Sequence, residues 1–494
     1  MNSAKPRRPR IIVIGAGTAG IPAALTALEL GAEVCLVEKS DRVGGMLWAS
    51  GAVLSGAGSR LQKSRGIDDT AEAHEREVMT AGRDRADPAL LRLATAEAGG
   101  TIDWLESIGT RFTPESPVVA GLADHHELYR TPRSYLLEAP PELGPYRGPV
   151  LAGVLQRVLE DVSRQDHLQE RLMIRLGTRV TALCTSDGRV VGCEVVGAAG
   201  PERLTADVVL LCTGGYAADQ TFLKRFHGHF AKLLSQGLAH ATGDGIRLAE
   251  AVGAEVVNED VVIPMMGAVE DPNRPGFRLS DTMVGFGRPP GIAGDIWINN
   301  QGRRFVPEDS ASPDERERAI LGQPGAVMIA LFDEPMRRGL TPEVGSWTKE
   351  HLGEPPDPRL VTSAATLPEL ASQLGIEPEV LSATVRDYNS AVNSGVDPLG
   401  RMALPRAIET APFHAVRTAS SIIVTFAGIR VDARLRVVDS LARPIPGLYA
   451  AGEVLGGGQI QGDGFSSGMS VTPAIAFGRL AARFGVEDLE ASDG

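Results

Sequence analysis

The sequence has little cysteine, few aromatic residues and no long apolar run. Of its 494 residues, four are cysteine and 5% are aromatic. The cysteines lie in apolar, strand-like runs without metal-ligand or redox-motif spacing, so we expect free thiols, no metal site and a reducing compartment. No stretch reaches the roughly 18 apolar residues that a transmembrane helix requires. We therefore expect no membrane span and a cytoplasmic location. The cysteines are Cys35, Cys184, Cys193 and Cys212.

An excess of basic residues is also missing. Lys and Arg number 49 against 62 Asp and Glu, which gives a formal net charge of −13, and the basic residues are scattered along the chain. This charge balance argues against nucleic acid or an anionic membrane as a partner. We attribute the acidity to solubility.

The length and composition predict a globular protein with more than one domain. A chain of 494 residues is too long for one ordinary core, and 43% hydrophobic with 22% charged residues is typical of a globular protein. The stretch 256–413 is richer in proline and loops and predicts an inserted domain. We expect this domain to separate residues 1–255 from residues 414–494, which return to a pattern of strand, glycine turn and helix.

The chain begins with a pattern typical of a β-α-β unit. Residues 11–14 form an apolar run, as in a strand buried on both faces of a parallel sheet. Residues 18–30 are rich in alanine and leucine and predict a helix, and residues 33–38 predict the second strand. Further strands are expected at 172–183, 189–196 and 206–212, as an antiparallel-looking set.

The turn between the first strand and the helix carries a dinucleotide-binding fingerprint. In this motif Gly15 permits the tight turn, Gly17 lets the backbone approach a pyrophosphate, and Gly20 allows close packing of helix on strand. The helix N-terminus stabilises the phosphates with free N–H groups and its dipole. Glu38 ends the second strand, where a carboxylate accepts a hydrogen bond from a ribose 2′-hydroxyl. The fingerprint alone leaves FAD and NAD open.

Two other segments could contact the same ligand. Gly44-Gly45 with Ser50-Gly51 follows Glu38 closely and predicts a second loop near the pyrophosphate. Near the other end of the chain, residues 444–453 read as a strand that runs into a turn ending in Glu453. Taken alone, this late segment could equally be a surface hairpin.

Together these motifs resemble, in order and over residues 11–482, the flavoprotein subunits of fumarate reductase and succinate dehydrogenase. That superfamily includes the 3-ketosteroid dehydrogenases, and the terminal loop 464–478 is closer to that branch. The resemblance implies a Rossmann-like α/β FAD-binding domain of the glutathione-reductase type, built from both chain ends, with an inserted α+β capping domain. The matching pieces are the Gly15 loop with Glu38, Gly44-Gly45, Thr213-Gly214-Gly215, Thr242-Gly243-Asp244-Gly245, Ile298-Asn299 with Gly302-Arg303-Arg304-Phe305 and Glu308, and residues 446–453.

The resemblance also implies how FAD is held. Glu453 corresponds to the acid that contacts the ribityl chain, and Met469 and Ser470 fall where a helix N-terminus meets the pyrimidine edge of the flavin. The residues after Gly45 include no histidine at the place where some relatives attach FAD, so non-covalent FAD is expected. The expected cofactor-binding residues are Gly15, Gly17, Ala19, Gly20, Glu38, Lys39, Gly44, Gly45, Ser50, Gly51, Val180, Thr213, Gly214, Asp244, Gly452, Glu453, Met469, Ser470 and Val471.

The chain departs from fumarate reductases at the positions that hold the dicarboxylate substrate. Ile263 stands where those enzymes carry a histidine, Ser312 where they carry an arginine, and Ile423-Val424 where they carry paired histidines. In the terminal loop, the stretch from Gln461 to Phe465 replaces their arginine. Burying a dicarboxylate without cationic partners is prohibitive. We therefore expect a small neutral carbonyl substrate, such as a cyclic ketone or steroid, rather than fumarate.

The resemblance to ketosteroid dehydrogenases implies the reaction. Those enzymes remove hydrogen across a carbon–carbon bond next to a ketone, with hydride passing to flavin N5 and a side chain acting as base. We expect the same chemistry here in either direction, with an electron donor or acceptor that the sequence does not identify. The candidate acid–base and hydrogen-bonding residues are Ser467, Asp463, Tyr129, Tyr135, Tyr146 and His126.

Two other functions are compatible with such a domain. One is a flavin-dependent monooxygenase or oxidase, although those families usually carry Gly-Asp where this chain has Gly452-Glu453. The other is a flavoprotein that binds a ligand without the chemistry of the family, since the catalytic arginine is missing. No second Gly-x-Gly-x-x-Gly unit indicates a dedicated NAD(P)H domain, and the oligomeric state stays open.

Overall fold

The computed structural model describes residues 7–119, 130–144, 146–228, 233–283, 294–310, 312–339 and 356–493. The chain forms two compact units. The first unit comprises Met1–Phe222, Gly237–Ile263 and Val424–Gly494, and the second comprises Leu223–Gln236 and Pro264–Ile423. The division therefore falls at other positions than 255/256 and 413/414. The reason is that residues 234–235 and 413–422 both form strands of the second unit's sheet.

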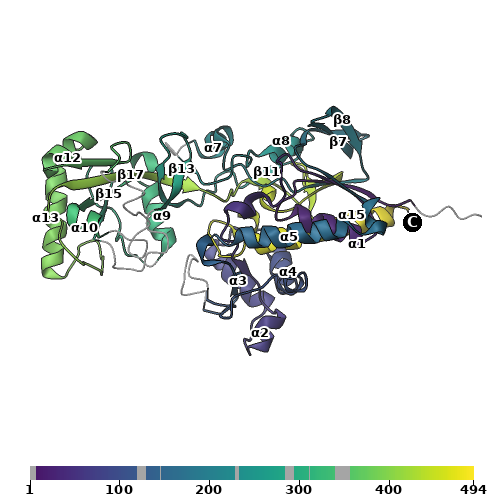
Figure 1. Cartoon of the computed structure of the whole chain (residues 1–494), viewed down its shortest axis with the longest axis horizontal. Helices are drawn as coiled ribbons and strands as arrows, with labels where there is room; N and C mark the ends of the chain where they lie inside the picture. The colour runs from purple at the N-terminus through teal and green to yellow at the C-terminus, as the bar shows by residue number, and fades with distance from the viewer. Residues whose placement is uncertain are drawn as a thin grey trace, which may run out of the picture. The chain divides into compact units, whose positions relative to one another are not determined.

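A six-stranded sheet forms the core of the first unit, in the order β19-β20-β9-β1-β2-β5. Figure 1 shows the whole chain, coloured from the N-terminus to the C-terminus. The strands β20, β9, β1, β2 and β5 run parallel, and β19 is an antiparallel edge. The apolar run of β1 is buried on both faces, as a parallel sheet requires. The bounds are β1 Arg10–Ile14, β2 Glu33–Val37, β5 Leu172–Arg175, β9 Val208–Leu211, β19 Arg436–Val438 and β20 Pro444–Ala450.

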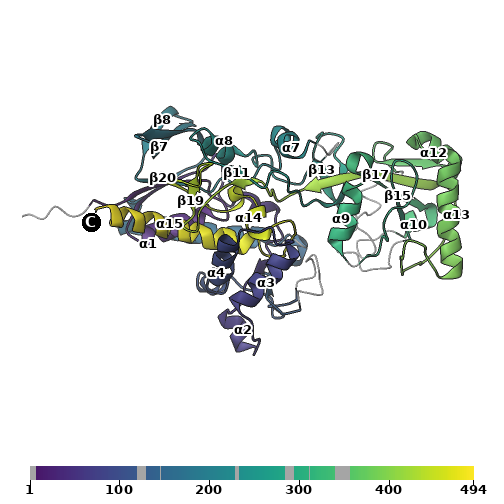
Figure 2. The same cartoon turned by 180° about the vertical axis from the view of Figure 1, so that it is seen from behind.

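Helices from both ends of the chain pack beside this sheet. Figure 2 shows α1 (Gly20–Glu29) and α15 (Val471–Asp493) running side by side, although about 450 residues separate them in sequence. The 20-residue helix α4 (Pro88–Ser107) packs against α15. Asp87 caps α4 by accepting from two backbone N–H groups, and Pro88 takes the first helical position, where its missing N–H costs nothing.

The antiparallel set has other members than the sequence predicted. Only β6 (Arg179–Ser186), β7 (Arg189–Gly197) and β8 (Gly200–Thr205) form the three-stranded antiparallel sheet, whereas β5 and β9 belong to the parallel sheet. The β6–β7 turn places Asp187 and Gly188 at positive φ, which suits a tight hairpin. Strand β8 was not predicted, because the residues of this strand are mostly exposed and lack an apolar pattern.

The remaining elements of the first unit are short or connect these layers. They are η1 Gly45–Ala49, β3 Leu54–Ser55, α2 Arg60–Ser64, α3 Ala71–Ala81, β4 Ser134–Tyr135, η2 Pro141–Leu143, α5 Gly148–Ser163, α6 Asp166–Gln169, α8 Asp244–Glu250, β11 Val256–Val257, β18 Gly428–Ile429, η4 Glu453–Leu455 and α14 Gly458–Gln461. The helix α7 (Gln220–His227) spans the point where the chain passes into the second unit.

The second unit is built around the long strand β17 (Phe413–Ile422) of a seven-stranded sheet. Alternate residues of its neighbour β15 face two apolar clusters, one with α9 and α10 and one with α12 and α13. The other bounds are β10 Leu234–Ser235, β12 Met265–Glu270, β13 Arg278–Met283, β14 Ile296–Ile298, α9 Pro313–Leu321, η3 Pro324–Ala326, β15 Val327–Asp333, α10 Glu334–Arg338, β16 Val361–Ala364, α12 Leu367–Leu374 and α13 Pro378–Ser394.

Two sequence features noted above have structural roles inside the second unit. The Arg304 guanidinium donates to Glu308 at 2.6 and 2.8 Å and to Asp397 at 2.7 Å, so the Gly-x-Arg motif supplies a buried ion network. Ser312, which stands where fumarate reductases carry an arginine, caps α9 by accepting from the Glu315 N–H at 3.2 Å.

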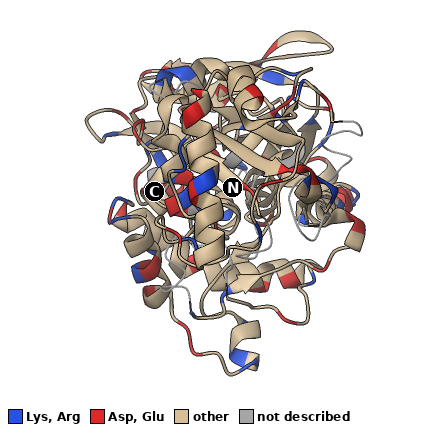
Figure 3. Ribbon diagram, turned by 90° about the vertical axis from the view of Figure 1, so that its left-hand side faces the viewer, with Lys and Arg blue, Asp and Glu red and all other residues tan. Residues whose placement is uncertain are grey.

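Basic and acidic residues lie close to each other in the described part of the chain. Figure 3 shows Lys and Arg interspersed with Asp and Glu along the drawn ribbons, consistent with the scattered basic residues of the sequence. Many of these charges pair with each other locally, as in Arg436–Asp432 and Arg443–Asp439. Within the described part of the chain, no helix is both long enough and apolar enough to cross a membrane.

Candidate functional site

The first glycine-rich loop joins the carboxyl end of β1 to α1. Gly15 has a φ of +99°, and a side chain on it would collide with the Cys212 carbonyl group. A side chain on Gly20 would collide with the Gly15 carbonyl oxygen. A Cβ on Gly17, in contrast, would meet only the Gly45 Cα, at 3.7 Å. Gly15 and Gly20 thus shape the turn, while Gly17 leaves its surface open for a ligand.

The N-terminus of α1 has the properties of a phosphate site. Ala19 occupies the N-cap and supplies no side-chain hydrogen bond, and the first turn carries no acidic residue. The positive end of its dipole therefore faces the loop, although the Ile21 N–H already donates to the Gly17 carbonyl oxygen at 3.2 Å and Pro22 has no N–H. This arrangement fits the pyrophosphate of a dinucleotide.

A second glycine-rich loop lies directly against the first. The Gly44 N–H donates to the Ala16 carbonyl oxygen at 2.7 Å, and both Gly44 and Gly45 have positive φ. A Cβ on Gly45 would lie 3.1 Å from the Gly17 Cα, so the two loops face each other without side chains between them. Ser50 takes a local role, because its hydroxyl accepts from the Ala52 N–H at 2.9 Å.

Glu38 lies at the end of β2, beside the first loop, as the sequence predicted. Its side chain is buried, and Oε2 accepts from the Ala16 N–H at 2.9 Å. The other oxygen accepts from the Ser40 N–H and hydroxyl at 2.8 Å. Both oxygens of the carboxylate therefore brace the loop.

Two residues expected to contact the cofactor form an ion pair. The Lys39 ammonium lies 3.0 Å from Asp244 Oδ2 and donates to the Thr242 hydroxyl at 2.7 Å. Burial raises the pKa of Asp244, but the Lys39 charge and the hydrogen bonds outweigh it and hold this pKa below its ordinary value. The pair links the end of β2 to the start of α8. Val180, on β6, is buried.

Glu453 is enclosed by the turn that follows β9. A side chain on Gly215 would collide with Glu453 and Thr425, and Glu453 Oε1 accepts from the Thr425 N–H and hydroxyl at 2.9 Å each. Loss of solvent raises the pKa of Glu453 above its ordinary value despite these bonds. Nearby, the Thr213 hydroxyl is buried and finds no hydrogen-bond partner among the described residues, as expected for a group that awaits a ligand.

A pocket opens beside Glu453, within the first unit. Its polar lining comes from Glu453, Gln461 and Ser470, and the rest is backbone or apolar surface. Gln461 donates to the Ser470 hydroxyl at 3.2 Å and accepts from the Ser466 N–H at 2.9 Å, which fixes both ends of its amide. The lining residues are Val424, Gly452, Glu453, Gly456, Gly457, Ile460, Gln461, Met469, Ser470, Pro473, Ala474 and Phe477.

Every residue that lines the pocket lies between Val424 and Phe477, in the C-terminal part of the first unit. Gly452, Glu453, Met469 and Ser470 were expected at the flavin and all line it, and Val471 begins α15 at its edge. Thr425 and Gln461 were not among the expected site residues. Single-sequence patterns give no signal for them, because their roles arise only from the packing of distant segments.

An apolar cluster adjoins this pocket. Ile263, Phe426 and Val261 are buried together, and Val424 and Phe465 pack against them. Val424 also lines the pocket. Three of the four departures from fumarate reductases noted in the sequence, at Ile263, Val424 and Phe465, therefore lie in one cluster, whereas Ser312 caps α9 in the second unit.

The candidate acid–base residues have different surroundings. Ser467 is 5% exposed and lies in the terminal loop between Phe465 and Met469, next to the pocket. Tyr135 is completely buried, and its hydroxyl bonds to Ser59 at 2.5 Å and to the Gly56 carbonyl at 3.2 Å, so this tyrosine is a core residue. Tyr146 is half-buried just before α5. Tyr129 and His126 lie outside the described residues.

The glycines of the terminal loop lie close to other segments of the chain. Side chains on Gly462 and Gly464 would collide with the Gly82 and Ala81 carbonyl groups, and one on Gly468 would lie 2.5 Å from the Ser55 backbone nitrogen. These glycines let the loop pack directly on the backbone that follows α3. Close approach to other segments of the chain is therefore their structural role.

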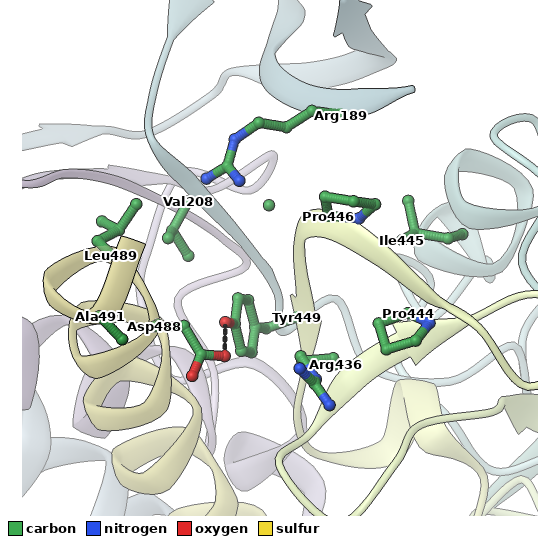
Figure 4. Close-up of a pocket in the computed structure, with 12 residues that line it drawn as sticks. Arg189, Val208, Arg436, Pro444, Ile445, Pro446, Tyr449, Asp488, Leu489 and Ala491 are labelled. Atoms are coloured by element: carbon green, nitrogen blue, oxygen red, sulfur yellow. Dashed lines mark hydrogen bonds between the residues drawn. The ribbon is translucent and has the colours of Figure 1, made fainter. Parts of the chain in front are cut away.

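A second cavity, of about 310 Å3, lies at the opposite end of the sheet (Figure 4). It is lined by the first residues of β9 and β20, Val208 and Pro444, and by the end of α15. The Tyr449 hydroxyl donates to Asp488 at 2.6 Å within it. Ligands of open parallel sheets bind at the carboxyl ends of the strands, where the glycine loops lie, so this cavity is not the cofactor site.

Comparison with known proteins agrees with this site. A family model described as an FAD binding domain matches residues 10–464. The probable fumarate reductase Ifc3 of Shewanella frigidimarina (strain NCIMB 400) is 29% identical over 475 residues, which cover 96% of this chain and 74% of that protein. The vinyl phenol reductase of Lactiplantibacillus plantarum is 26% identical over 497 residues, which cover 96% of this chain and 94% of that protein.

Solved structures show the same architecture. The open conformation of a flavocytochrome c3 fumarate reductase matches with a TM-score of 0.74 at 27% identity, over 98% of this chain and 78% of that one. A 3-ketosteroid Δ1-dehydrogenase from Sterolibacterium denitrificans shares the fold, with a TM-score of 0.74 at 21% identity over 97% and 99% of the chains. The predicted fold and FAD are thus confirmed. The chain belongs to the FAD-binding domain family that includes the fumarate reductases, and it is an FAD-dependent oxidoreductase that acts on carbon–carbon double bonds.

Proposed function

We propose that this enzyme reduces, or in reverse forms, a carbon–carbon double bond conjugated to a carbonyl group in a neutral, cyclic ketone or steroid-like substrate. The observation that carries this proposal is the apolar cluster beside the pocket, which holds Ile263, Val424 and Phe465. An apolar wall favours contact with a neutral molecule, because each apolar group that it covers is removed from water.

The same wall disfavours a dicarboxylate. Fumarate carries two negative charges, and burying them without cationic partners costs far more than the remaining contacts return. Ser312 is occupied in capping α9 and supplies no charge. The similarity to the vinyl phenol reductase supports the proposal of a neutral substrate. That relative aligns over nearly its whole length and is named for a substrate other than fumarate.

The residues of the first unit fit the role of holding FAD. The facing loops at Gly17 and Gly45 suit the pyrophosphate, and the Thr213 hydroxyl and the Glu453 carboxyl suit the polar groups nearer the flavin. Bound FAD supplies the hydride acceptor or donor, and a separate electron carrier must return it to its starting state. The protein supplies the proton at the adjacent carbon, and Asp463 and Ser467 are the proton-transfer and hydrogen-bonding side chains that the terminal loop offers.

A panel of oxidants tests the substrate class. The holoenzyme is photoreduced without oxygen, mixed with each compound, and followed by its flavin absorbance. Cyclic enones, steroid enones and vinyl phenols are compared with fumarate, acrylate and urocanate at matched concentrations. We expect rapid reoxidation by at least one neutral cyclic enone and slow reoxidation by the three carboxylates. Reoxidation by fumarate at the rate of a true fumarate reductase would refute the proposal.

A further inference from the structure

A strained turn follows α3 in the first unit. Arg83 and Asp84 have φ values of +54° and +56°, so two successive residues with side chains adopt the left-handed conformation. This conformation costs energy for residues other than glycine, and such strain persists only where surrounding structure enforces it. The turn is therefore held in this shape by its neighbours.

The neighbour that holds it is the terminal loop. The Asp463 N–H donates to the Gly82 carbonyl oxygen at 3.0 Å, and the Asp87 N–H donates to the Gln459 carbonyl oxygen at 2.8 Å. Side chains on Gly462 and Gly82 would collide with the facing backbone, so the two segments interlock main chain to main chain. Any group on this turn is consequently fixed relative to the loop.

Arg83 uses this position to reach Asp463. One guanidinium nitrogen, Nη1, donates to the Asp463 carbonyl oxygen and lies 3.8 Å from its carboxylate Oδ2. The side chains are 35% and 19% exposed, so the pair is partly withdrawn from solvent. The guanidinium thus hydrogen-bonds to the main chain of Asp463 and lies within ion-pairing distance, but beyond hydrogen-bonding distance, of its carboxylate, so it attracts that carboxylate toward Arg83.

We propose that Arg83 is the positioning residue for Asp463 in the reaction. Fumarate reductases carry an arginine in the terminal loop itself, but here Phe465 belongs to the apolar cluster. Arg83 brings a cation to the same loop from a different element. It orients the Asp463 carboxylate, which then transfers the proton at the carbon adjacent to the hydride step. This inference rests on the proposed function, because it assumes proton transfer beside the Gln461 end of the pocket.

The same turn offers a matched control. Arg85 lies two residues along the chain and pairs at 2.6 Å with Asp260, whose side chain is 68% exposed. An Arg85→Ala change removes the same charge from the same turn without touching the terminal loop's carboxylate. A difference between the two alanine variants therefore reports on the Asp463 contact and not on net charge or on the stability of the turn.

The experiment measures kcat and KM for the best neutral enone, together with FAD content, in Arg83→Ala, Arg83→Lys, Arg85→Ala, Asp463→Asn and the Arg83→Ala/Asp463→Asn double variant. We expect Arg83→Ala to lower kcat by about 10-fold or more at nearly constant KM, and Arg83→Lys to recover part of it. We expect the kcat of Arg85→Ala to stay within about 2-fold of the parent's kcat, because this change leaves the acid–base residue in place. In the Asp463→Asn background, Arg83→Ala has little further effect, because the group that it positions is gone.

Two results would overturn the inference. One is an Arg83→Ala effect no larger than that of Arg85→Ala, and the other is full additivity of Arg83→Ala with Asp463→Asn. If the parent enzyme turns over no neutral enone, the proposed function fails first. The pair is then tested by the thermal midpoints of the same holoproteins, in which a non-additive cycle supports positioning and an additive cycle overturns it.

Discussion

The first glycine-rich loop and the terminal loop, both in the first unit, look alike in sequence but have different structural roles. In the first loop, a side chain on Gly17 would meet only the Gly45 Cα, at an ordinary contact distance of 3.7 Å, beside the positive end of the α1 dipole. In the terminal loop, Gly462, Gly464 and Gly468 are all pressed against other backbone. A run of glycines therefore marks close approach, but only the packing tells whether the approaching partner is a ligand or the chain itself.

The largest effects are expected in the first loop. Gly20→Ala forces a methyl group onto the Gly15 carbonyl oxygen, so we expect loss of more than about 3 kcal/mol of unfolding free energy and loss of FAD. Gly17→Ala meets no such obstacle in the chain and should leave the apoprotein's melting temperature nearly unchanged while lowering FAD affinity. Melting curves of apoprotein and FAD titrations measure both. Equal stability losses in the two variants would contradict the contrast.

The terminal loop is expected to affect the reaction rate more than the cofactor. A Ser467 hydroxyl that donates to the substrate oxygen is worth about 100-fold or more in rate, whereas a serine that only caps a helix costs about 1 kcal/mol of stability. We expect Ser467→Ala and Asp463→Asn to slow flavin reduction or reoxidation by substrate with FAD binding intact. Stopped-flow absorbance and melting temperatures separate these outcomes. Parental rates in both variants would make the loop structural.

A glycine of the terminal loop should respond as a packing residue. Gly468 has a φ of +84°, and a Cβ there would lie 2.5 Å from the Ser55 nitrogen. Gly468→Ala is expected to cost about 1–3 kcal/mol in unfolding free energy, as overpacking usually does. Denaturant unfolding measures the change. The control is Gly188→Ala, which also has positive φ but faces open space, so any extra cost at Gly468 comes from the contact.

The next prediction concerns a buried histidine that contacts Ser55, and it appears only at acidic pH. Burial lowers the pKa of His74 to about 3 from an ordinary 6.5, and Nε2 bonds to the Ser55 hydroxyl at 3.2 Å. The unfolded chain therefore binds the extra proton between these values, and stability is complete above pH 6.5 and falls as pH drops toward 3. We expect His74→Gln to flatten this part of the stability curve. Unfolding free energies measured at several pH values test it, and an unchanged slope would exclude His74 as its source.

The last prediction concerns how FAD is attached to the protein. The segment Met46-Leu47-Trp48-Ala49 after the second loop has no histidine to bond to the flavin. Acid precipitation is therefore expected to leave FAD in the supernatant. Flavin that stays with the pellet would show a covalent link.

Much of the fold and the cofactor site could be read from local patterns. The strand, the glycine turn and the acid at Glu38 lie within 30 residues, and their periodicity and spacing are properties of the chain alone. β5 and β9 were assigned to the wrong sheet, because a short apolar strand carries no mark of its partners. Tyr135 was a candidate at the site by elimination, and its burial against Ser59 could not be seen in the sequence.

The sequence by itself determined the β-α-β unit and its glycine fingerprint, because these depend on residue types at fixed spacings, and the resemblance to the fumarate reductase superfamily added FAD. Only the tertiary structure decided that Ile263, Val424 and Phe465 form one apolar surface, and that Arg83 reaches the terminal loop. These residues are separated by 40 to 380 positions, and nothing local links them. Contacts at such separations follow from how the whole chain packs, which is why they had to be observed.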